Sequence, residues 1–257
     1  ESLGMLQIDT INIVARSPYL ALFSRLGAYN PAWLDELLVE GRIFEYWAHV
    51  ACYLPGADYP LHRRLCLEGQ HGWFSQEWYE ANRAVIDGVL AHIRTNGPAR
   101  SADFERTDGK KGSWWDWKIE KRALEYWFAR GELMTARRHN FQRVYDLRER
   151  VRPDWDDRDA PPLEAVERDL ALKAVRGLGV AKAGWVWDYF RRPKSVTNSL
   201  VQQLAAEGAL VEVGVEGWTE PLYAHPDIRP LLVQAQAGRL QAERTTLLSP
   251  FDSLICN

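Results

Sequence analysis

The stretch of sequence that decides the fold is residues 118–147, KIEKRALEYWFARGELMTARRHNFQRVYDL. Apolar residues return every three or four positions over 118–130, which is the period of a helix that packs one face against a core. Gly131 stands where such a helix takes its left-handed C-terminal cap. Two alternating segments follow at 132–136 and 143–147, and the polar residues between them suit the tip of a β-hairpin. We therefore predict a helix, a glycine and a hairpin in direct succession.

The residues before this stretch complete a recognisable order of elements. A long amphipathic segment covers 83–94, and an Asn-Gly-Pro breaker at 96–98 ends it. A short segment led by Ser101 then precedes the helix of 118–130. Three helices followed by a hairpin is the order of winged-helix domains, so we predict one such unit over residues 81–152.

The same order recurs in the C-terminal half of the chain. Its three helical segments, its glycine and its two strand-like runs fall at 163–176, 182–191, 195–207, 208, 209–213 and 221–223. The junction between helix and hairpin is also repeated, as Arg-Gly-Glu-Leu at 130–133 and Glu-Gly-Ala-Leu at 207–210. Repetition of this kind is the signature of tandem structural units, and it predicts a second winged helix over 163–226.

The remaining segments fit around these two units. A helix at 32–40, Gly41 and a strand-like run at 42–47 indicate a modified copy within residues 1–80. The acidic, proline-rich segment 153–162 is interpreted as a linker, and residues 227–257 follow the last predicted unit. The predicted fold class is α+β and mainly helical, with tandem winged-helix units.

Composition restricts the classes of protein to consider. The chain has 257 residues, 46% of them hydrophobic, which suffices for a sizeable core. Its three cysteines, Cys52, Cys66 and Cys256, form no Cys-x-x-Cys pair, so we expect no disulfide framework, no metal site and a reducing cytoplasm. No apolar run approaches the roughly 20 residues that cross a bilayer. Because the chain starts without methionine and ends within an apolar pattern, we expect a fragment.

The charge is small in sum but segregated along the chain. The net charge is −3, yet residues 94–152 hold 15 basic and 9 acidic side chains, whereas 154–169 hold 2 basic and 7 acidic ones. A local excess of this size suits a phosphate-binding face, and it equally suits a solvated surface with compensating pairs.

The position of the charges on the predicted elements favours DNA. Winged helices place their third helix in the major groove and a wing on the backbone. Basic and polar side chains fall on these elements, on the loop before them, and after the first helix. The predicted DNA-binding residues are Arg16, Ser17, Lys110, Lys111, Lys121, Arg122, Arg137, Arg138, Lys194 and Asn198.

Motifs along almost the whole chain resemble one family. They are Leu3-Gly4-Met5-Leu6-Gln7-Ile8-Asp9-Thr10, Val14-Ala15-Arg16-Ser17, Glu45-Tyr46-Trp47-Ala48-His49, Lys121-Arg122-Ala123-Leu124-Glu125, Arg143-Val144-Tyr145-Asp146-Leu147, Val215-Glu216-Gly217-Trp218 and Leu247-Leu248-Ser249-Pro250-Phe251-Asp252. Together they are similar to the YcaQ/AlkZ-type winged-helix DNA glycosylases of bacteria.

The resemblance implies an activity, a partner and a site. It implies tandem winged helices around a concave DNA-binding face, a monofunctional glycosylase activity, and a C-terminal β-rich domain to which residues 227–257 would connect. We also expect the protein to be cytoplasmic and monomeric and to need no cofactor. Its partner is double-stranded DNA with alkylated purines such as N7-alkylguanine, or with interstrand crosslinks that it unhooks. The family signature of Gln, an apolar residue, then Gln or Asp maps onto Gln7, Ile8 and Asp9, the Asp form of the YcaQ branch. His49 is a further candidate for the catalytic site, and a packed histidine without a catalytic role is the alternative reading.

The chemistry of this pair can be judged without the family. In a strand, alternation puts Gln7 and Asp9 on one face and Ile8 on the other, so the polar pair can hold a water. An N7-alkylguanine is cationic and leaves as a neutral base, so a single carboxylate suffices to polarise water and stabilise the sugar cation. The alternative is a winged-helix transcriptional regulator without catalysis, in which the pair merely caps a strand.

Overall fold

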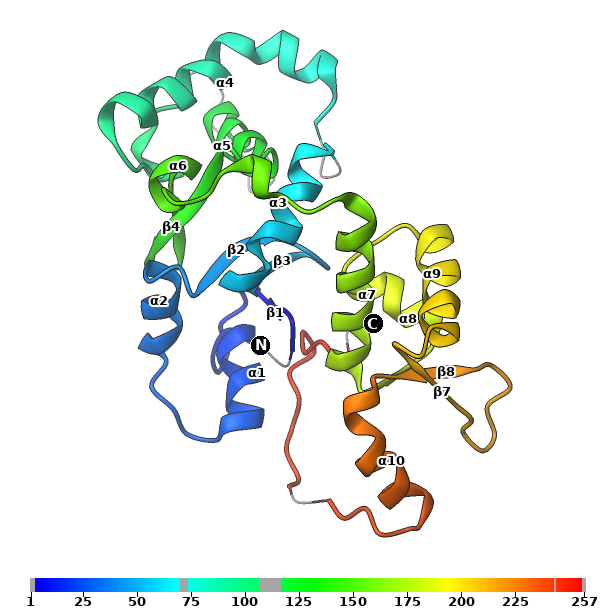
Figure 1. Cartoon of the computed structure of the whole chain (residues 1–257). Helices are drawn as coiled ribbons and strands as arrows, with labels where there is room; N and C mark the ends of the chain where they lie inside the picture. Colours follow the sequence, from blue (N-terminus) through cyan, green and yellow to red (C-terminus); the bar gives the residue numbers. More distant parts are fainter. Residues whose placement is uncertain (1–2, 70–73, 107–116, 243, 256–257) are drawn as a thin grey trace. The chain divides into compact units, whose positions relative to one another are not determined.

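The computed structural model describes residues 3–69, 74–106, 117–242 and 244–255, and it has an α+β fold with small antiparallel sheets (Figure 1). Two compact units are built from alternating parts of the chain. Unit 1 comprises Glu1–Tyr29, Ala48–Tyr53 and Pro162–Asn257, and unit 2 comprises Asn30–Trp47 and Leu54–Pro161. The segment 1–80 that we expected as one unit is therefore divided between both. Within the described residues, no helix is both long and apolar enough to span a membrane.

Unit 2 contains residues 118–147, for which a helix, a glycine and a hairpin were predicted. Its elements are α2 (Ala32–Val39), β2 (Ile43–Trp47), α3 (Tyr59–Leu67), α4 (Gln76–Asn96), α5 (Ile119–Ala129), β4 (Leu133–His139), β5 (Gln142–Leu147) and α6 (Arg148–Val151), with 3-10 turns at Gly56–Asp58, Ser101–Asp103 and Asp157–Asp159. The apolar faces of α4 and α5 meet the hairpin through Ile86, Leu124, Phe128 and Leu133, all buried. Gly131 takes the expected left-handed conformation, with φ of 70°.

Unit 1 contains the second predicted copy. Its elements are β1 (Leu6–Gln7), α1 (Ser17–Leu26), most of β3 (Ala51–Pro55), α7 (Leu163–Leu178), β6 (Val180–Ala181), α8 (Ala183–Tyr189), α9 (Lys194–Ala206), β7 (Val211–Val213), β8 (Leu222–Ala224), a 3-10 turn (Pro226–Ile228) and α10 (Arg229–Gln236). Helices α7, α8 and α9 pack through Val166, Leu170, Tyr189, Val201 and Leu204, which are all buried. The predicted three helices and hairpin are thus present.

The internal repeat extends to the order of the strands. In the C-terminal copy the sheet order is β6-β8-β7, so the last strand lies between the first and the second. The first sheet of the chain, β1-β3-β2, has the same order. In the middle copy, Ala99 forms an isolated β-bridge with Tyr145 of β5, and β5 also pairs with β4. Ala99 thus takes the position that the short first strand has in the other sheets. The same strand order, first, last, second, is therefore found in all three places.

Two predicted boundaries in unit 2 were wrong, for identifiable reasons. Helix α4 begins at Gln76 rather than near residue 83, because the Ser75 hydroxyl accepts a hydrogen bond from the Trp78 amide and caps the helix. The hairpin tip is not 137–140, since β4 continues to His139. Asn140 and Phe141 both have positive φ, 48° and 64°, which is typical of a two-residue type I′ turn.

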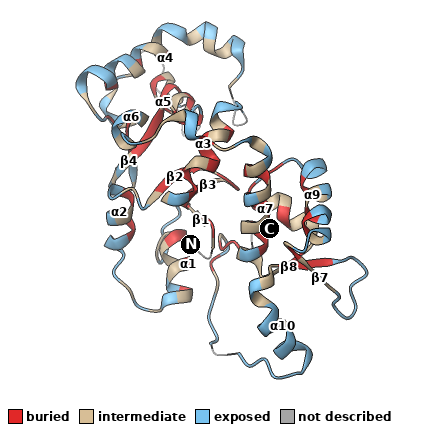
Figure 2. Ribbon diagram, viewed as in Figure 1, coloured by how far each residue is buried: buried red, intermediate tan, exposed pale blue. Residues whose placement is uncertain are grey.

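A buried ion-pair cluster fixes this hairpin to β2, in the region where Figure 2 shows buried residues along β4. The Glu45 side chain is fully buried, and its carboxylate is shared by Arg143 and Arg138, the latter at 2.7 Å. Arg143 also donates to Glu125 at 3.0 Å. Burial alone would raise the pKa of the Glu45 carboxyl, but the two guanidinium charges outweigh it and leave the pKa below its ordinary value.

The predicted linker 153–162 is bound along its second half to α3. Arg63 donates to both carboxylate oxygens of Asp157, at 2.8 and 2.7 Å, and holds the pKa of that carboxyl at about 2. The neighbouring Arg64 donates to the main-chain carbonyls of Ala160 and Pro161, at 2.8 and 2.7 Å. The chain up to Pro161 is therefore part of unit 2 rather than a free spacer.

Replacement of Glu45 tests the cluster. Glu45→Gln removes the carboxylate that Arg138 and Arg143 share and leaves Arg143 with Glu125 alone. The free energy of unfolding should therefore fall by about 3 to 5 kcal/mol. Denaturant unfolding at neutral pH measures the change. Glu40→Gln, an exposed carboxylate beside the same strand, should alter it by less than about 0.5 kcal/mol. Equal effects of the two substitutions would show that the cluster does not hold the hairpin.

Candidate active site

The predicted catalytic pair lies at the end of the shortest strand of the first sheet. Strand β1 pairs antiparallel with β3, with Gln7 opposite Cys52, and the Ile8 amide continues the pairing by donating to the Ala51 carbonyl at 2.8 Å. Ile8 is 9% exposed, whereas Gln7 and Asp9 are half-buried on the other side. The expected alternation of the three residues is present. Gln7 Oε1 is buried, and the described residues give it no hydrogen-bond donor.

One hydroxyl group joins the backbone of the two polar residues. Ser17, the first residue of α1, donates from Oγ to the Gln7 carbonyl and accepts from the Asp9 amide, both at 3.0 Å. Asp9 Oδ1 in turn accepts from the Ile11 amide at 2.7 Å, which is an Asx turn. The backbone and the side chain of Asp9 are therefore both restrained, and so is the backbone of Gln7.

The role that we predicted for Ser17, contact with a DNA phosphate, does not fit this position. Its side chain is 3% exposed, and its hydroxyl is engaged by the backbone of Gln7 and Asp9. A serine before a proline at a helix start is expected to cap its own helix. Since its partners lie eight and ten residues earlier, no local pattern could have identified this role.

His49, the third candidate, lies between β2 and β3 and is 8% exposed. Its Nδ1 atom is 3.0 Å from the carbonyl oxygen of Asp188, and its Nε2 atom is 3.0 Å from Nη2 of Arg191. Arg191 also forms an ion pair with the Asp188 carboxylate. All three residues belong to unit 1. The histidine is packed, with a hydrogen-bonding partner at each ring nitrogen.

The predicted DNA-binding residues of unit 2 lie in unlike environments. Lys121 and Arg122 of α5 lie over the rings of Trp117 and Trp78, at 3.8 and 4.4 Å from the ring centres, and burial lowers the pKa of Lys121. Arg137 is exposed on β4, and the described residues offer it no carboxylate within ion-pair distance. Lys110 and Lys111 lie outside the described residues.

Arg138, adjacent in sequence to Arg137, belongs to the buried Glu45 cluster. Its side chain is 6% exposed, so we assign it to packing of the hairpin rather than to phosphate. A β-bulge between Thr135 and Arg137 shifts the register of β4 just before this pair. The opposite directions of Arg137 and Arg138 follow from strand alternation once β4 is known to continue through them.

The predicted residues of unit 1 lie at helix starts. Arg16 is half-buried at the residue before α1. Lys194 is exposed at the start of α9, and Asn198 is one turn further along the same helix. The Asn198 Oδ1 atom is buried, and the part of the chain that the structure describes gives it no donor. Of these residues, the exposed Lys194 and the half-buried Arg16 are accessible to a ligand.

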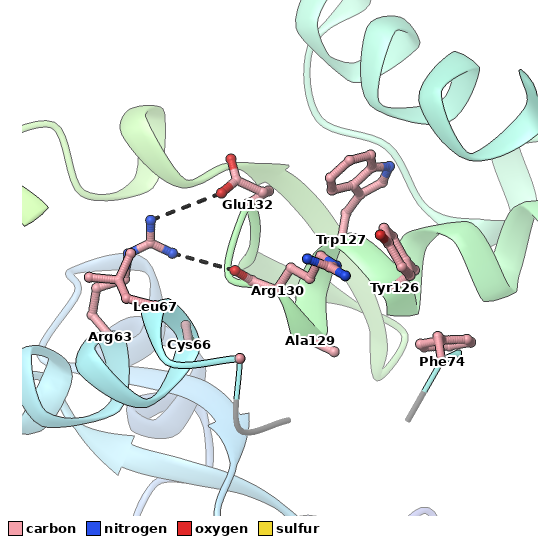
Figure 3. A pocket seen from close by; sticks show the side chains of 10 residues that line it. Arg63, Cys66, Leu67, Phe74, Tyr126, Trp127, Ala129, Arg130 and Glu132 are labelled. Atoms are coloured by element: carbon pink, nitrogen blue, oxygen red, sulfur yellow. Dashed lines mark hydrogen bonds and ion pairs between the residues drawn. The ribbon is translucent and has the colours of Figure 1, made fainter. Parts of the chain in front are cut away.

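A pocket of about 300 Å³ in unit 2 has none of the predicted site residues in its lining (Figure 3). Arg63 and Glu132 lie on one side of it, Tyr126 and Arg130 on another. Burial raises the pKa of the Cys66 thiol in its wall to about 11, so this cysteine is protonated and unsuited to nucleophilic chemistry. Among the described residues, no group of His, Cys, Asp or Glu is arranged to hold a metal ion.

Comparison with known proteins places this architecture among enzymes of DNA repair that remove bases. The family model described as "DNA glycosylase AlkZ-like" matches residues 1–257. The chain therefore belongs to the AlkZ-like family of DNA glycosylases. Among solved structures, the DNA glycosylase AlkZ of Streptomyces sahachiroi is similar, with a TM-score of 0.63 and 14% identity over 98% of this chain and 68% of that one. At this identity the likeness concerns the fold.

Removal of the Ser17 hydroxyl tests whether it holds the pair. Ser17→Ala deletes one hydrogen bond to each of Gln7 and Asp9, so the Asp9 amide should lose protection from hydrogen exchange, and stability should fall by about 1 to 2 kcal/mol. Ser24→Ala is the matched control, because Ser24 is buried in the same helix and donates to Ala21 within it. Unchanged Asp9 protection in Ser17→Ala would contradict the role.

Proposed function

We propose that this DNA glycosylase is monofunctional and hydrolyses the N-glycosidic bond of cationic N7-alkylguanine, including guanines joined in interstrand crosslinks. The observation that carries the proposal is the position of Gln7 and Asp9, which lie two residues apart at the end of β1 with the buried Ile8 between them. Ser17 restrains the backbone of both residues. A cationic base needs no strong acid for its departure, and this site offers one carboxylate and one amide.

The reaction follows from these two groups. The bond between C1′ and the base breaks, and its electron pair neutralises the positive charge of the leaving base. In this proposal the Asp9 carboxylate stabilises the sugar cation and takes a proton from the attacking water. Gln7 Oε1, a buried acceptor to which the described residues donate no hydrogen bond, accepts one from that water. The products are a free base and an abasic sugar.

We infer that the three repeated segments are winged helices that bind double-stranded DNA. The common strand order and the helix–glycine–hairpin junctions support this assignment. The exposed cations Arg137 of β4 and Lys194 of α9 would contact phosphates, and Arg16 and Asn198 are further contacts at helix starts. Lys121 and Arg122, which lie over tryptophan rings, would contribute positive potential in unit 2.

Loss of the Asp9 charge tests the mechanism. Asp9→Asn keeps the shape of the side chain but removes its charge. Electrostatic stabilisation of a transition state by one such group is worth about 3 to 4 kcal/mol, so release of N7-methylguanine from a duplex should fall at least about a hundredfold. Strand breaks after alkali treatment measure the rate. Gln7→Ala should cost less, and Ile8→Val, on the buried side, should leave the rate near that of the wild type. Asp9→Asn at full rate, with an unchanged melting temperature, would refute the assignment.

The two neighbouring arginines of β4 make a matched test of DNA binding. Arg137→Ala should weaken binding to damaged and undamaged duplex alike, and reduce the salt slope by about one, because one phosphate contact is lost. Arg138→Ala should instead lower thermal stability, because it breaks the Glu45 cluster. Fluorescence titration at several salt concentrations separates the two. The reverse assignment of effects would contradict the structure of the hairpin.

A further inference from the structure

Arg191 occupies the turn between α8 and α9 and is held there by three separate contacts. Its Nη1 atom pairs with the Asp188 carboxylate, its Nη2 atom lies 3.0 Å from His49 Nε2, and its amide donates to the Asp188 carbonyl at 3.1 Å. The side chain nevertheless remains 49% exposed. A guanidinium has five N–H donors, so donors remain for a ligand outside the cluster.

The hydrogen bonds of His49 define which of its ring nitrogens donates and which accepts. A carbonyl oxygen can only accept and a guanidinium can only donate, so Nδ1 carries the proton toward Asp188 and Nε2 accepts from Arg191. This is the neutral imidazole with one tautomer selected. Both ring nitrogens are occupied within the cluster, so His49 takes no proton from a substrate or from water in this arrangement. Its contribution passes through Arg191.

The backbone of Arg191 is in a conformation that L-residues rarely adopt. Its φ is 51°, in the left-handed region, which costs a side-chain-bearing residue about 1 kcal/mol or more. Residues held in this way are concentrated at ligand-binding and catalytic positions, because the rest of the structure must compensate for them. Glycine would adopt this conformation without cost. The presence of arginine instead indicates that its side chain has a role at this position.

The residues next to Arg191 contact the segment that leads into the candidate active site. The Tyr189 hydroxyl donates to the Leu3 carbonyl, and the Phe190 ring lies against Gly4, where an added Cβ would be 3.3 Å from it. Gly4 is three residues before Gln7. The turn that carries Arg191 is therefore packed against the start of the strand that bears the proposed catalytic pair.

We propose that Arg191 is a fixed ligand for a phosphate of the DNA backbone beside the candidate active site, and that His49 is the positioning residue that orients it. The proposal rests on the proposed function only for the location of the active site, since binding to undamaged DNA can be measured without base release. Arginine suits this task because its planar donors remain charged and keep their geometry. Lysine could not contact Asp188, His49 and phosphate with one fixed plane of donors.

Replacement of Arg191 by glycine gives the cleanest test, because glycine suits the backbone and removes only the side chain. Arg191→Gly should weaken binding to undamaged duplex about fivefold to tenfold at 0.1 M salt and reduce the salt slope by about one. Arg176→Ala is the matched control, because Arg176 has similar exposure and pairs with Asp227. It should leave both values unchanged. An unchanged slope in Arg191→Gly, at normal melting temperature, would overturn the proposal.

A double-mutant cycle tests the role of His49. His49→Ala should weaken duplex binding by itself, but it should have almost no additional effect in an Arg191→Gly background. An effect of His49→Ala on binding or base release that persists in that background would show that His49 acts independently of Arg191. Base release by Asp9→Asn is measured in parallel. If Asp9→Asn stayed active while Arg191→Gly lost its phosphate contact, the proposed chemistry alone would fail.

Discussion

The pairing of two-residue β1 with β3 is the constraint on which the candidate site depends. It turns Ile8 into the core and leaves Gln7 and Asp9 together on the other side. A slip of one residue would exchange these directions and bury the carboxylate. Two residues cannot fix a register by themselves, and the Ser17 hydroxyl adds the missing restraint by binding the backbone on either side of Ile8. The start of α1 is thus also a support for the strand.

Much of the fold could be predicted because its signals are local. Helical periods, the glycine at each helix end and the repeated junction at 130–133 and 207–210 depend only on neighbouring residues. Gln7 and Asp9 were predicted as a pair from the resemblance to the glycosylase family, and strand alternation predicted only that the two side chains share a face. Contacts between distant residues were not readable: Glu45 meets Arg138 across 93 positions and His49 meets Arg191 across 142. The sequence alone therefore misassigned Arg138 and gave no indication that Arg191 is held in place.

The division of the chain explains why residues 1–80 could not be treated as one domain. Unit 2 takes β2 from this segment because the carboxylate of Glu45 neutralises two arginines of the β4–β5 hairpin. Unit 1 takes β1, α1 and most of β3, and completes them with the turn that carries Asp188 and Arg191. In unit 2 a buried charge thus helps to decide which segments fold together, because a buried charge left without its partner is strongly destabilising.

The attachment of the linker by Arg64 has a consequence for how this sequence can diverge. Arg64 binds the main-chain carbonyls of Ala160 and Pro161, and every amino acid provides the same carbonyl. Substitution of either residue would therefore leave this contact in place. The number of residues between them and Asp157 is constrained, however, because Arg63 binds the Asp157 side chain. Related proteins can accordingly vary the composition of this segment, whereas an insertion or deletion between Asp157 and Pro161 would misalign both arginines at once.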